Sequence, residues 1–267
     1  MTQAERRLYL IRSLLNEKTE YKSIAVPSDA DGQKQLLRSL MNVRMPKAID
    51  DEFLKIQDEY LQEELEQAGI TGLSDLPQID GDLYLWQGDI TKLKCGAIVN
   101  AANSGMTGCY VPCHACIDNC IHSFAGIQLR LECAKLMKKQ GFEEPTGQAK
   151  ITKAYNLPCD YVIHTVGPIV NGKVTAKDEQ LLVSCYRSCL TLAERYGIDS
   201  IAFCCISTGV FCFPNERAAE IAVHTVRQYK AETGSKMRVI FNVFKDTDRE
   251  IYKRLLSTDQ AAEKSAR

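Results

Sequence analysis

Apolar residues in the first quarter of the chain recur at helical spacing. Two such stripes consist of Leu8, Ile11, Leu14 and Leu15, and of Leu36, Leu37 and Leu40. Ser28 or Asp29 can cap the second helix, and a third is expected to begin within residues 48–51 and to continue to Gly69. This region contains no cluster of chemically reactive side chains. We therefore expect residues 1–72 to form a helical extension packed on the main domain.

From residue 73 onward the pattern changes to alternating strands and helices. Short apolar runs predict strands at residues 83–87, 97–100, 150–155, 161–166, 200–206 and 239–243. Longer amphipathic segments predict helices at about 116–139, 177–196, 215–233 and 246–256. Such alternation is typical of an α/β fold with a largely parallel sheet and helices on both faces. Residues 73–267 are thus expected to form one domain, with its core at about 80–257, that binds ligands beyond the carboxyl ends of its strands.

Charge and cysteine content narrow the classes of function. The 267 residues include 33 basic and 34 acidic side chains, which argues against a protein that binds nucleic acid by charge alone. Twelve cysteines occur without a signal peptide or a membrane-spanning apolar segment. We therefore expect reduced thiols, some of them on a metal, in a cytosolic protein without a membrane partner.

Six sulfur and imidazole side chains lie within fourteen residues, shortly after the strand at 97–100. They are Cys109, Cys113, His114, Cys116, Cys120 and His122. Such a set can supply four ligands to a structural zinc, or three to a catalytic zinc that keeps an open position. The alternative is that several of these cysteines are small buried hydrophobic residues. The glycine and asparagine residues just before them favour the close approach of a ligand to the backbone.

Two other predicted strands end in residues that can contact a nucleotide-like ligand. The small-residue turn at 206–211 precedes a helix, so it is either an anion site suited to a diphosphate or an ordinary connection. Asp89 follows the first strand, where it can accept from an amine or a ribose hydroxyl, or cap the next turn. Residues that fit better in the core are Cys185, Cys189, Cys204, Cys205 and His164.

Four motifs in this order resemble the macrodomain family, which has a three-layer α/β/α fold and recognises ADP-ribose. They are Gly-Asp-Ile at 88–90, Val-Asn-Ala-Ala-Asn-Ser at 99–104, Tyr-Val-Ile-His-Thr-Val-Gly at 161–167 and Ile-Ser-Thr-Gly-Val-Phe at 206–211. The run at 108–119 resembles the zinc-containing microbial branch of that family. Members of this branch carry a helical N-terminal extension and remove mono-ADP-ribose from proteins. They often occur beside a sirtuin-type transferase that acts on a lipoyl-carrier protein.

The resemblance implies one Zn²⁺ per chain, held by Cys109, His114 and Cys116 with an open fourth position. It leaves Cys113 and Cys120 without a role at the metal.

The resemblance also implies a set of ADP-ribose contacts. Asp89 would hold the adenine amine with Ile90 alongside, and Asn103 would contact the distal ribose. From the segment that contains the six sulfur and imidazole side chains, Cys116, Ile117 and Asp118 would approach the ligand. The turn at 206–211 would wrap around the diphosphate and the distal ribose through Ser207, Thr208, Gly209, Val210 and Phe211. Some relatives have an acidic residue where this chain has Val210. If that carboxylate takes part in turnover, its absence would slow this enzyme or move the role to Asp118 or the metal.

We therefore expect a hydrolase that removes mono-ADP-ribose from acidic protein side chains, with Asn103 and Asp118 as its catalytic residues. Three alternatives stay open. The first is an ADP-ribose reader with a structural zinc, and the second is an O-acetyl-ADP-ribose deacetylase that uses the same pocket. The third is a zinc-dependent nucleic-acid binder, which the balanced charge disfavours.

Overall fold

The N-terminal extension is helical, as predicted. The computed structural model describes the backbone of residues 1–265 and the side chains of residues 1–257. The extension contains α1 (Gln3–Asn16), a 3₁₀ turn (Thr19–Ser23), α2 (Ala30–Val43) and α3 (Asp51–Ala68). Asp29 caps α2 by accepting from the backbone of Gly32, and Gly69 ends α3. The three helices share an apolar core that also includes Ile127 of the main domain and is distinct from the core around the sheet.

A mixed, largely parallel sheet forms the centre of the main domain. Its strands are β2 (Gln78–Asp80), β3 (Leu83–Gln87), β5 (Ala97–Ala102), β6 (Ala149–Lys153), β7 (Tyr161–Val166), β8 (Ser200–Phe203) and β9 (Arg238–Val243). Their spatial order is β2-β3-β9-β8-β5-β7-β6. The five inner strands run parallel, and the two edge strands are antiparallel to their neighbours. The carboxyl ends of β3, β9, β8, β5 and β7 therefore lie along one edge.

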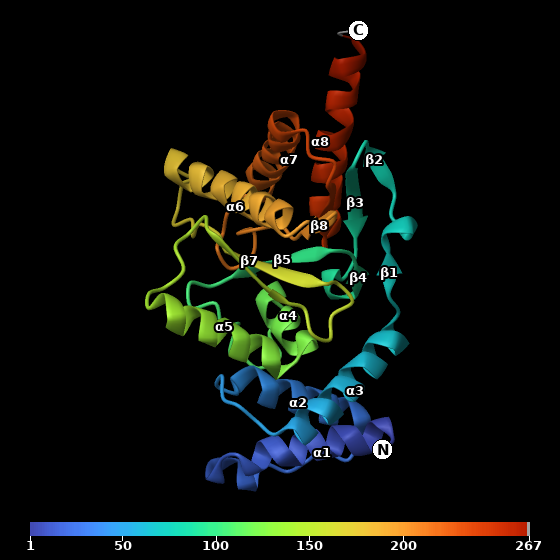
Figure 1. Cartoon of the computed structure of the whole chain (residues 1–267), viewed down its shortest axis with the longest axis vertical. Coiled ribbons are helices and arrows are strands. Elements are labelled where there is room, and N and C mark those ends of the chain that lie inside the picture. The colour runs from blue at the N-terminus through green and yellow to red at the C-terminus, as the bar shows by residue number, and fades with distance from the viewer. Residues whose placement is uncertain (266–267) are drawn as a thin grey trace.

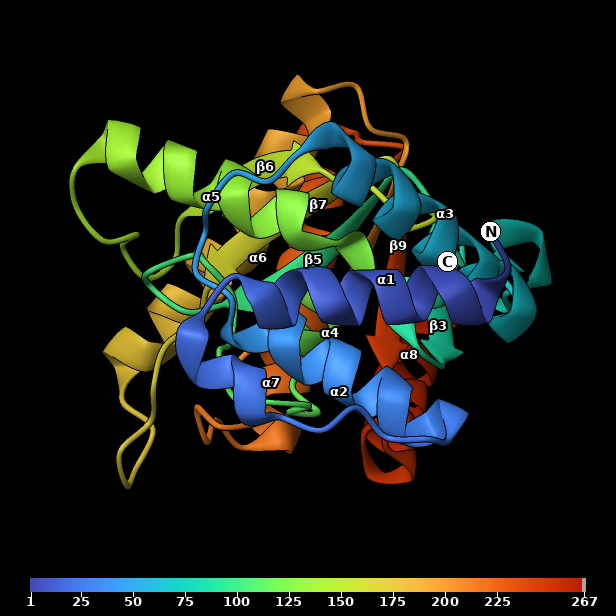
Figure 2. The same cartoon turned by 90° about the horizontal axis from the view of Figure 1, so that it is seen from below.

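Helices cover both faces of the sheet, which confirms the expected three-layer α/β/α fold (Figure 1). One face carries α4 (Ile117–Ala125) and α5 (Ile127–Gln140). The other carries α6 (Ala176–Arg195), α7 (Asn215–Thr233) and α8 (Asp246–Ser265). The extension lies outside the first helical layer, with α2 packed against α4 (Figures 1 and 2).

Within residues 1–265, no helix combines the length and apolar character that crossing a bilayer requires.

The predicted helix over 116–139 is in fact two helices. Gly126 has φ +96° and separates α4 from α5. Gln57 of α3 accepts a hydrogen bond from the backbone of Ile127 at 3.0 Å, so the extension caps the start of α5. A Cβ at position 126 would lie 2.6 Å from Gln57 Nε2, which explains the glycine.

Other elements also differ from their predicted bounds: the strand predicted at 150–155 is β6 at 149–153, and the helix predicted at 246–256 continues to Ser265. The strand predicted over 200–206 ends at Phe203, because the next residues turn away as a loop. The connector after the extension contains the short β1 (Thr71–Gly72), which pairs in parallel with β4 (Leu93–Lys94), as well as edge strand β2.

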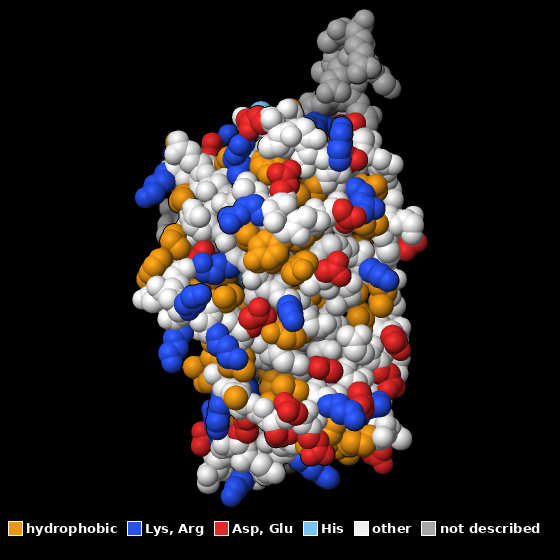
Figure 3. Space-filling model, in the orientation of Figure 1, with side chains coloured by type: hydrophobic (Ala, Val, Ile, Leu, Met, Phe, Trp, Pro, Cys, Tyr) orange, Lys and Arg blue, Asp and Glu red, His pale blue; other side chains and the backbone are white. Residues whose placement is uncertain are grey.

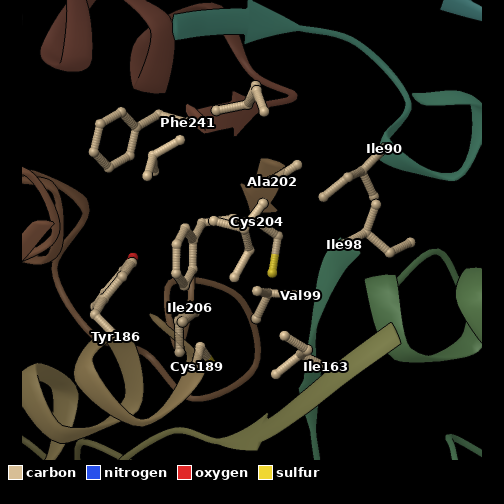
Figure 4. Packing of buried hydrophobic residues seen from close by; sticks show 14 of the residues in the cluster. Ile90, Ile98, Val99, Ile163, Tyr186, Cys189, Ala202, Cys204, Ile206 and Phe241 are labelled. Carbon is tan, nitrogen blue, oxygen red and sulfur yellow. The ribbon is translucent and has the colours of Figure 1, made fainter. Parts of the chain in front are cut away.

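The cysteines assigned to the core are confirmed there. All twelve cysteines lie within the described residues and are free thiols. Cys185 and Cys189 are fully buried on the inner face of α6, and Cys204 is buried after β8. Figure 4 shows Cys189 and Cys204 among apolar side chains that include Val99 and Ile206. Cys205 is partly buried against the same cluster.

Candidate functional site

Every site residue predicted from the sequence lies at or beside the carboxyl edge of the parallel strands. Asp89 follows β3, Ser207 lies in the loop after β8, and Asn103 follows β5. The strand order places the β8 loop between the other two. Asp89 and Asn103 are three strand spacings apart, about 14 Å. The edge therefore suits an extended ligand with its anionic group in the middle.

The loop at 103–116, between β5 and α4, brings three possible metal ligands together. The ligand atoms of Cys109, His114 and Cys116 all lie within 4.8 Å of one another. Cys109 Sγ is 3.6 Å from His114 Nδ1. A tetrahedral zinc would hold sulfur and nitrogen about 3.5 Å apart, so the donor set and its spacing both fit zinc.

The environment of Cys116 also suits a cation. Burial, together with the nearby Cys109 thiol, raises the pKa of Cys116 to about 12. A cation would therefore be needed to keep the Cys116 sulfur as a thiolate at neutral pH. Cys116 is the N-cap of α4 and accepts from the backbone of Asn119 at 3.4 Å, where the helix terminus favours negative charge.

The other sulfur and imidazole side chains of this region lie apart from the trio. Cys113 Sγ is 3.2 Å from Ser39 Oγ, and Cys120 Sγ is 3.5 Å from the Arg38 guanidinium. His122 is buried on the inner side of α4, where burial lowers its pKa well below the ordinary value. The structure thus groups the three ligands that the resemblance implies.

Asp118 is the buried carboxylate of the site, and two amides hold it. Asn100 donates to Asp118 Oδ1 at 2.8 Å, and Asn103 donates to Asp118 Oδ2 at 3.2 Å. Burial raises the pKa of Asp118 to about 6, against the opposing effects of these hydrogen bonds and of Arg130. The carboxyl group is therefore ionised at neutral pH and close to a proton-accepting range.

His164 supports this carboxylate from behind. Asn100 is paired with His164 across β5 and β7, and its amide lies 3.1 Å from His164 Nδ1. His164 Nε2 is 2.9 Å from Thr152 Oγ1. With Nδ1 accepting from the amide, the Nε2–H donates to the hydroxyl. His164 is fully buried, and burial lowers its pKa to about 3. It is a core histidine, as predicted, and it helps to orient Asn100.

Asn103 links the strand end to the loop at 103–116. Its amide nitrogen also donates to the carbonyl of Gly108 at 3.2 Å, while its oxygen accepts from the backbone of Gly105 at 3.0 Å. These contacts fix the side chain beside Asp118 and leave it half-buried. A ligand at this strand end would meet both groups together.

The loop at 204–214 has the features of an anion site. Within the described residues, the backbone N–H groups of Gly209, Val210 and Phe211 donate no hydrogen bonds. Three consecutive free amides suit a diphosphate. Ser207 has φ +66° and is buried, a strained conformation of the kind found at ligand sites. A Cβ at Gly167 would lie 2.0 Å from Ser207 Oγ, so the glycine makes room for this turn.

Beside these amides, Thr208 is half-buried, and its hydroxyl donates to the carbonyl of Cys205 at 3.0 Å. Ile117, the first residue of α4, is partly buried against the core of the sheet domain.

At the other end of the edge, Asp89 serves as a cap. Its Oδ1 accepts from the backbone and the hydroxyl of Thr91, at 3.0 and 2.6 Å. Ile90 is buried, so its backbone is the part available to a ligand. Phe244, at the end of neighbouring β9, is 78% exposed. An exposed ring beside the Asp89 turn is suited to stack on a base.

Sequence reasoning missed Phe244 and Asn100 as parts of the site. Phe244 could have been found as an aromatic residue directly after a predicted strand. The role of Asn100 depends on strand register, which no local pattern reveals.

A second buried trio carries metal-binding atoms but has a different chemistry. His122, Cys133 and His164 also lie within 4.8 Å of one another. Both nitrogens of His164 already have partners, and burial raises the pKa of Cys133 far above its usual range. A neutral thiol and an engaged imidazole do not favour a metal.

Comparisons with known proteins agree with this geometry. The Macro domain family matches residues 99–222. The Protein-ADP-ribose hydrolase of Treponema medium is 60% identical over 261 residues, covering 96% of this chain and all of that protein. Its namesake in Staphylococcus aureus strain MSSA476 is 48% identical over 253 residues, covering 94% and 95% of the two chains.

Among solved structures, the Trypanosoma brucei macrodomain in complex with ADP-ribose is similar, with a TM-score of 0.64 and 30% identity. The match covers 82% of this chain and 95% of that one. The family expected from the sequence is confirmed: this chain belongs to the Macro domain family.

Proposed function

We propose that this chain is a zinc-dependent hydrolase that removes mono-ADP-ribose from acidic side chains of modified proteins. The observation that carries this proposal is the meeting of Asn103, Asp118 and the Cys109–His114–Cys116 trio around one strand end. The relatives that match nearly the whole chain are named protein-ADP-ribose hydrolases, which supports hydrolysis of ADP-ribosyl groups.

The order of groups along the strand edge matches the order of groups in ADP-ribose. Asp89 and Phe244 lie at one end and would hold the adenine. The free amides of Gly209 and Val210 would hold the diphosphate in the middle. Asn103 would then meet the distal ribose beside the metal trio. Holding the reacting bond in one geometry can contribute several kcal/mol toward catalysis.

The reaction is the addition of water across the ester bond between ribose C1″ and the acceptor carboxylate. The hydroxyl goes to C1″, the C1″–oxygen bond breaks, and its electron pair leaves with the carboxylate. Asp118 accepts the proton from water, because its carboxylate is ionised and fixed by two amides. Asn103 orients the ribose hydroxyls. Cys109, His114 and Cys116 would hold a zinc ion, which when bound would supply a Lewis acid beside this strand end.

A lipoyl-carrier protein is the first modified protein to test. This choice rests on the resemblance to the zinc-containing, sirtuin-linked branch.

One observation favours a second function, that of an ADP-ribose reader. Val210 is 71% exposed in the loop at 204–214, at a position where some macrodomains have an acidic residue. A reader would hold ADP-ribose without turning over modified protein. Turnover therefore separates the two functions.

The test compares wild type, Asn103→Ala and the neighbouring control Ser104→Ala on a mono-ADP-ribosylated protein and on O-acetyl-ADP-ribose. We expect Asn103→Ala to lower kcat on modified protein about 100-fold, because the ribose loses its orientation. Its Kd for ADP-ribose should change less, since the adenine and diphosphate contacts remain. Ser104→Ala removes only an exposed bond to Glu143 and should behave as wild type. Tight binding without turnover in wild type would make the chain a reader, and turnover of O-acetyl-ADP-ribose alone would make it a deacetylase.

A further inference from the structure

Helix α2 of the N-terminal extension makes specific polar contacts with the loop at 103–116. The Arg38 guanidinium donates to the carbonyl of His114 at 2.9 Å and to Asn119 Oδ1 at 2.9 Å. The same nitrogen is 3.5 Å from Cys120 Sγ. One side chain of the extension thus holds the backbone of a metal ligand and the asparagine behind it.

Asn119, the residue that Arg38 engages, fixes the rest of the loop. Its side-chain amide donates to the carbonyls of Cys109 and Val111, at 3.3 and 2.9 Å. Its backbone N–H donates to Cys116 Sγ. All three ligands are therefore anchored through Arg38 and Asn119.

A second residue of α2 supports the strained centre of the loop. Asn42 accepts from the backbone N–H of Cys113 at 2.9 Å and donates to Ser123 Oγ at 2.8 Å. Cys113 has φ +51°, a left-handed conformation that a non-glycine residue keeps only where its surroundings enforce it. Asn42 is 1% exposed, so solvent does not compete for these bonds.

The main domain also contacts α2, through Arg130 of α5. Its guanidinium donates to the carbonyls of Met41, Asn42 and Arg44 at the end of α2, at 3.1, 2.6 and 2.7 Å. It also donates to the carbonyl of Cys109 at 3.3 Å and lies over the Tyr110 ring at 4.3 Å. A cation at a helix C-terminus is favourable, so Arg130 ties α2 and the first ligand into one unit.

We propose that α2 positions the metal-binding loop and that Arg38 is its principal positioning residue. The extension then has a role at the active site, because it positions the loop at 103–116, and it is more than a helical appendage packed on the main domain. The expected effect of Arg38 on zinc affinity rests on the proposed function. Its expected effect on the conformational order of the loop at 103–116 does not. Residues that orient metal ligands from the outer shell typically change metal affinity 10–100-fold when they are replaced.

The test uses full-length Arg38→Gln and Arg38→Lys. Lys34→Gln is the control, because it removes a charge from the same helix at an ion pair with Glu64. Zinc affinity is measured by competition with a chelator, and hydrogen exchange is followed over residues 103–119. We expect Arg38→Gln to bind zinc about 10–100-fold more weakly and to exchange faster in this segment, with or without zinc. Arg38→Lys should recover part of both effects, and Lys34→Gln should match wild type.

Wild-type zinc affinity and unchanged loop exchange in Arg38→Gln would overturn the proposal. Equal losses in Lys34→Gln would also overturn it, because the effect would then be general destabilisation. If wild type itself binds no zinc, the proposed function fails, and loop exchange in the zinc-free proteins decides this proposal alone.

Discussion

Acidification should remove stability contributed by His164, the buried histidine that contacts the Asp118 carboxylate through Asn100. Burial lowers the pKa of His164 to about 3 in the folded state, from about 6.5 in the unfolded chain. Because the folded pKa is the lower one, the stabilisation is complete above pH 6.5 and is lost as the pH falls toward 3. Each pH unit in this window removes about 1.4 kcal/mol. The contribution of His164 alone therefore falls by about 2 kcal/mol between pH 8 and pH 5.

The perturbation that isolates this term is His164→Gln, and the assay is urea unfolding at both pH values. The variant should be less stable than wild type at pH 8, because it loses the packing of the ring and its bond to Asn100. At pH 5 the difference should be smaller by about 2 kcal/mol, since only wild type carries the His164 titration. A difference between wild type and His164→Gln that is the same at pH 8 and pH 5 would refute the reasoning.

Two further predictions concern ligand binding. Gly167→Ala should weaken ADP-ribose binding in calorimetry, because the new Cβ would displace Ser207 Oγ and the loop at 204–214, the proposed diphosphate site. The expected loss is about 1–3 kcal/mol, and wild-type affinity would show that the loop adapts. Phe244→Ala should weaken ADP-ribose binding by about 1–3 kcal/mol but leave binding of ribose 5-phosphate unchanged, because the ring is expected to stack on adenine. Equal losses for both ligands would place Phe244 outside the adenine site.

Local patterns predicted most elements of the sheet domain. The strand at 83–87 and the helix at 215–233 have their predicted bounds, because turn-forming residues flank a clear apolar period. The break at Gly126 was missed, since one glycine costs a helix only about 1 kcal/mol. At this break Gln57, 70 residues away in sequence, caps the next helix by accepting from the backbone of Ile127.

Some parts of the candidate site could be predicted from local sequence, and others depend on contacts between distant residues. The ligand trio lies within eight residues, and the motifs at the strand ends meet because parallel strands place them on one edge. The network of Asn100 and His164 needs the register of β5 and β7. Arg38 lies 76 residues before His114, in a region without a chemical cluster of its own. No local sequence pattern predicts such contacts.

Charge gives no support to the nucleic-acid alternative. Basic and acidic side chains are interspersed over the face shown in Figure 3, and the net charge is −1. A nucleic-acid binder typically gathers its basic residues in one stripe.

The central claim is that Cys109, His114 and Cys116 hold a zinc ion needed to hydrolyse the ADP-ribosyl bond. It is tested most directly by the release of ADP-ribose from a mono-ADP-ribosylated protein, using zinc-loaded, chelator-stripped and zinc-reconstituted enzyme. Circular dichroism checks that the stripped protein stays folded. We expect release to stop in the folded, stripped enzyme and to return with one equivalent of Zn²⁺ per chain. Full release by the zinc-free enzyme would contradict the claim.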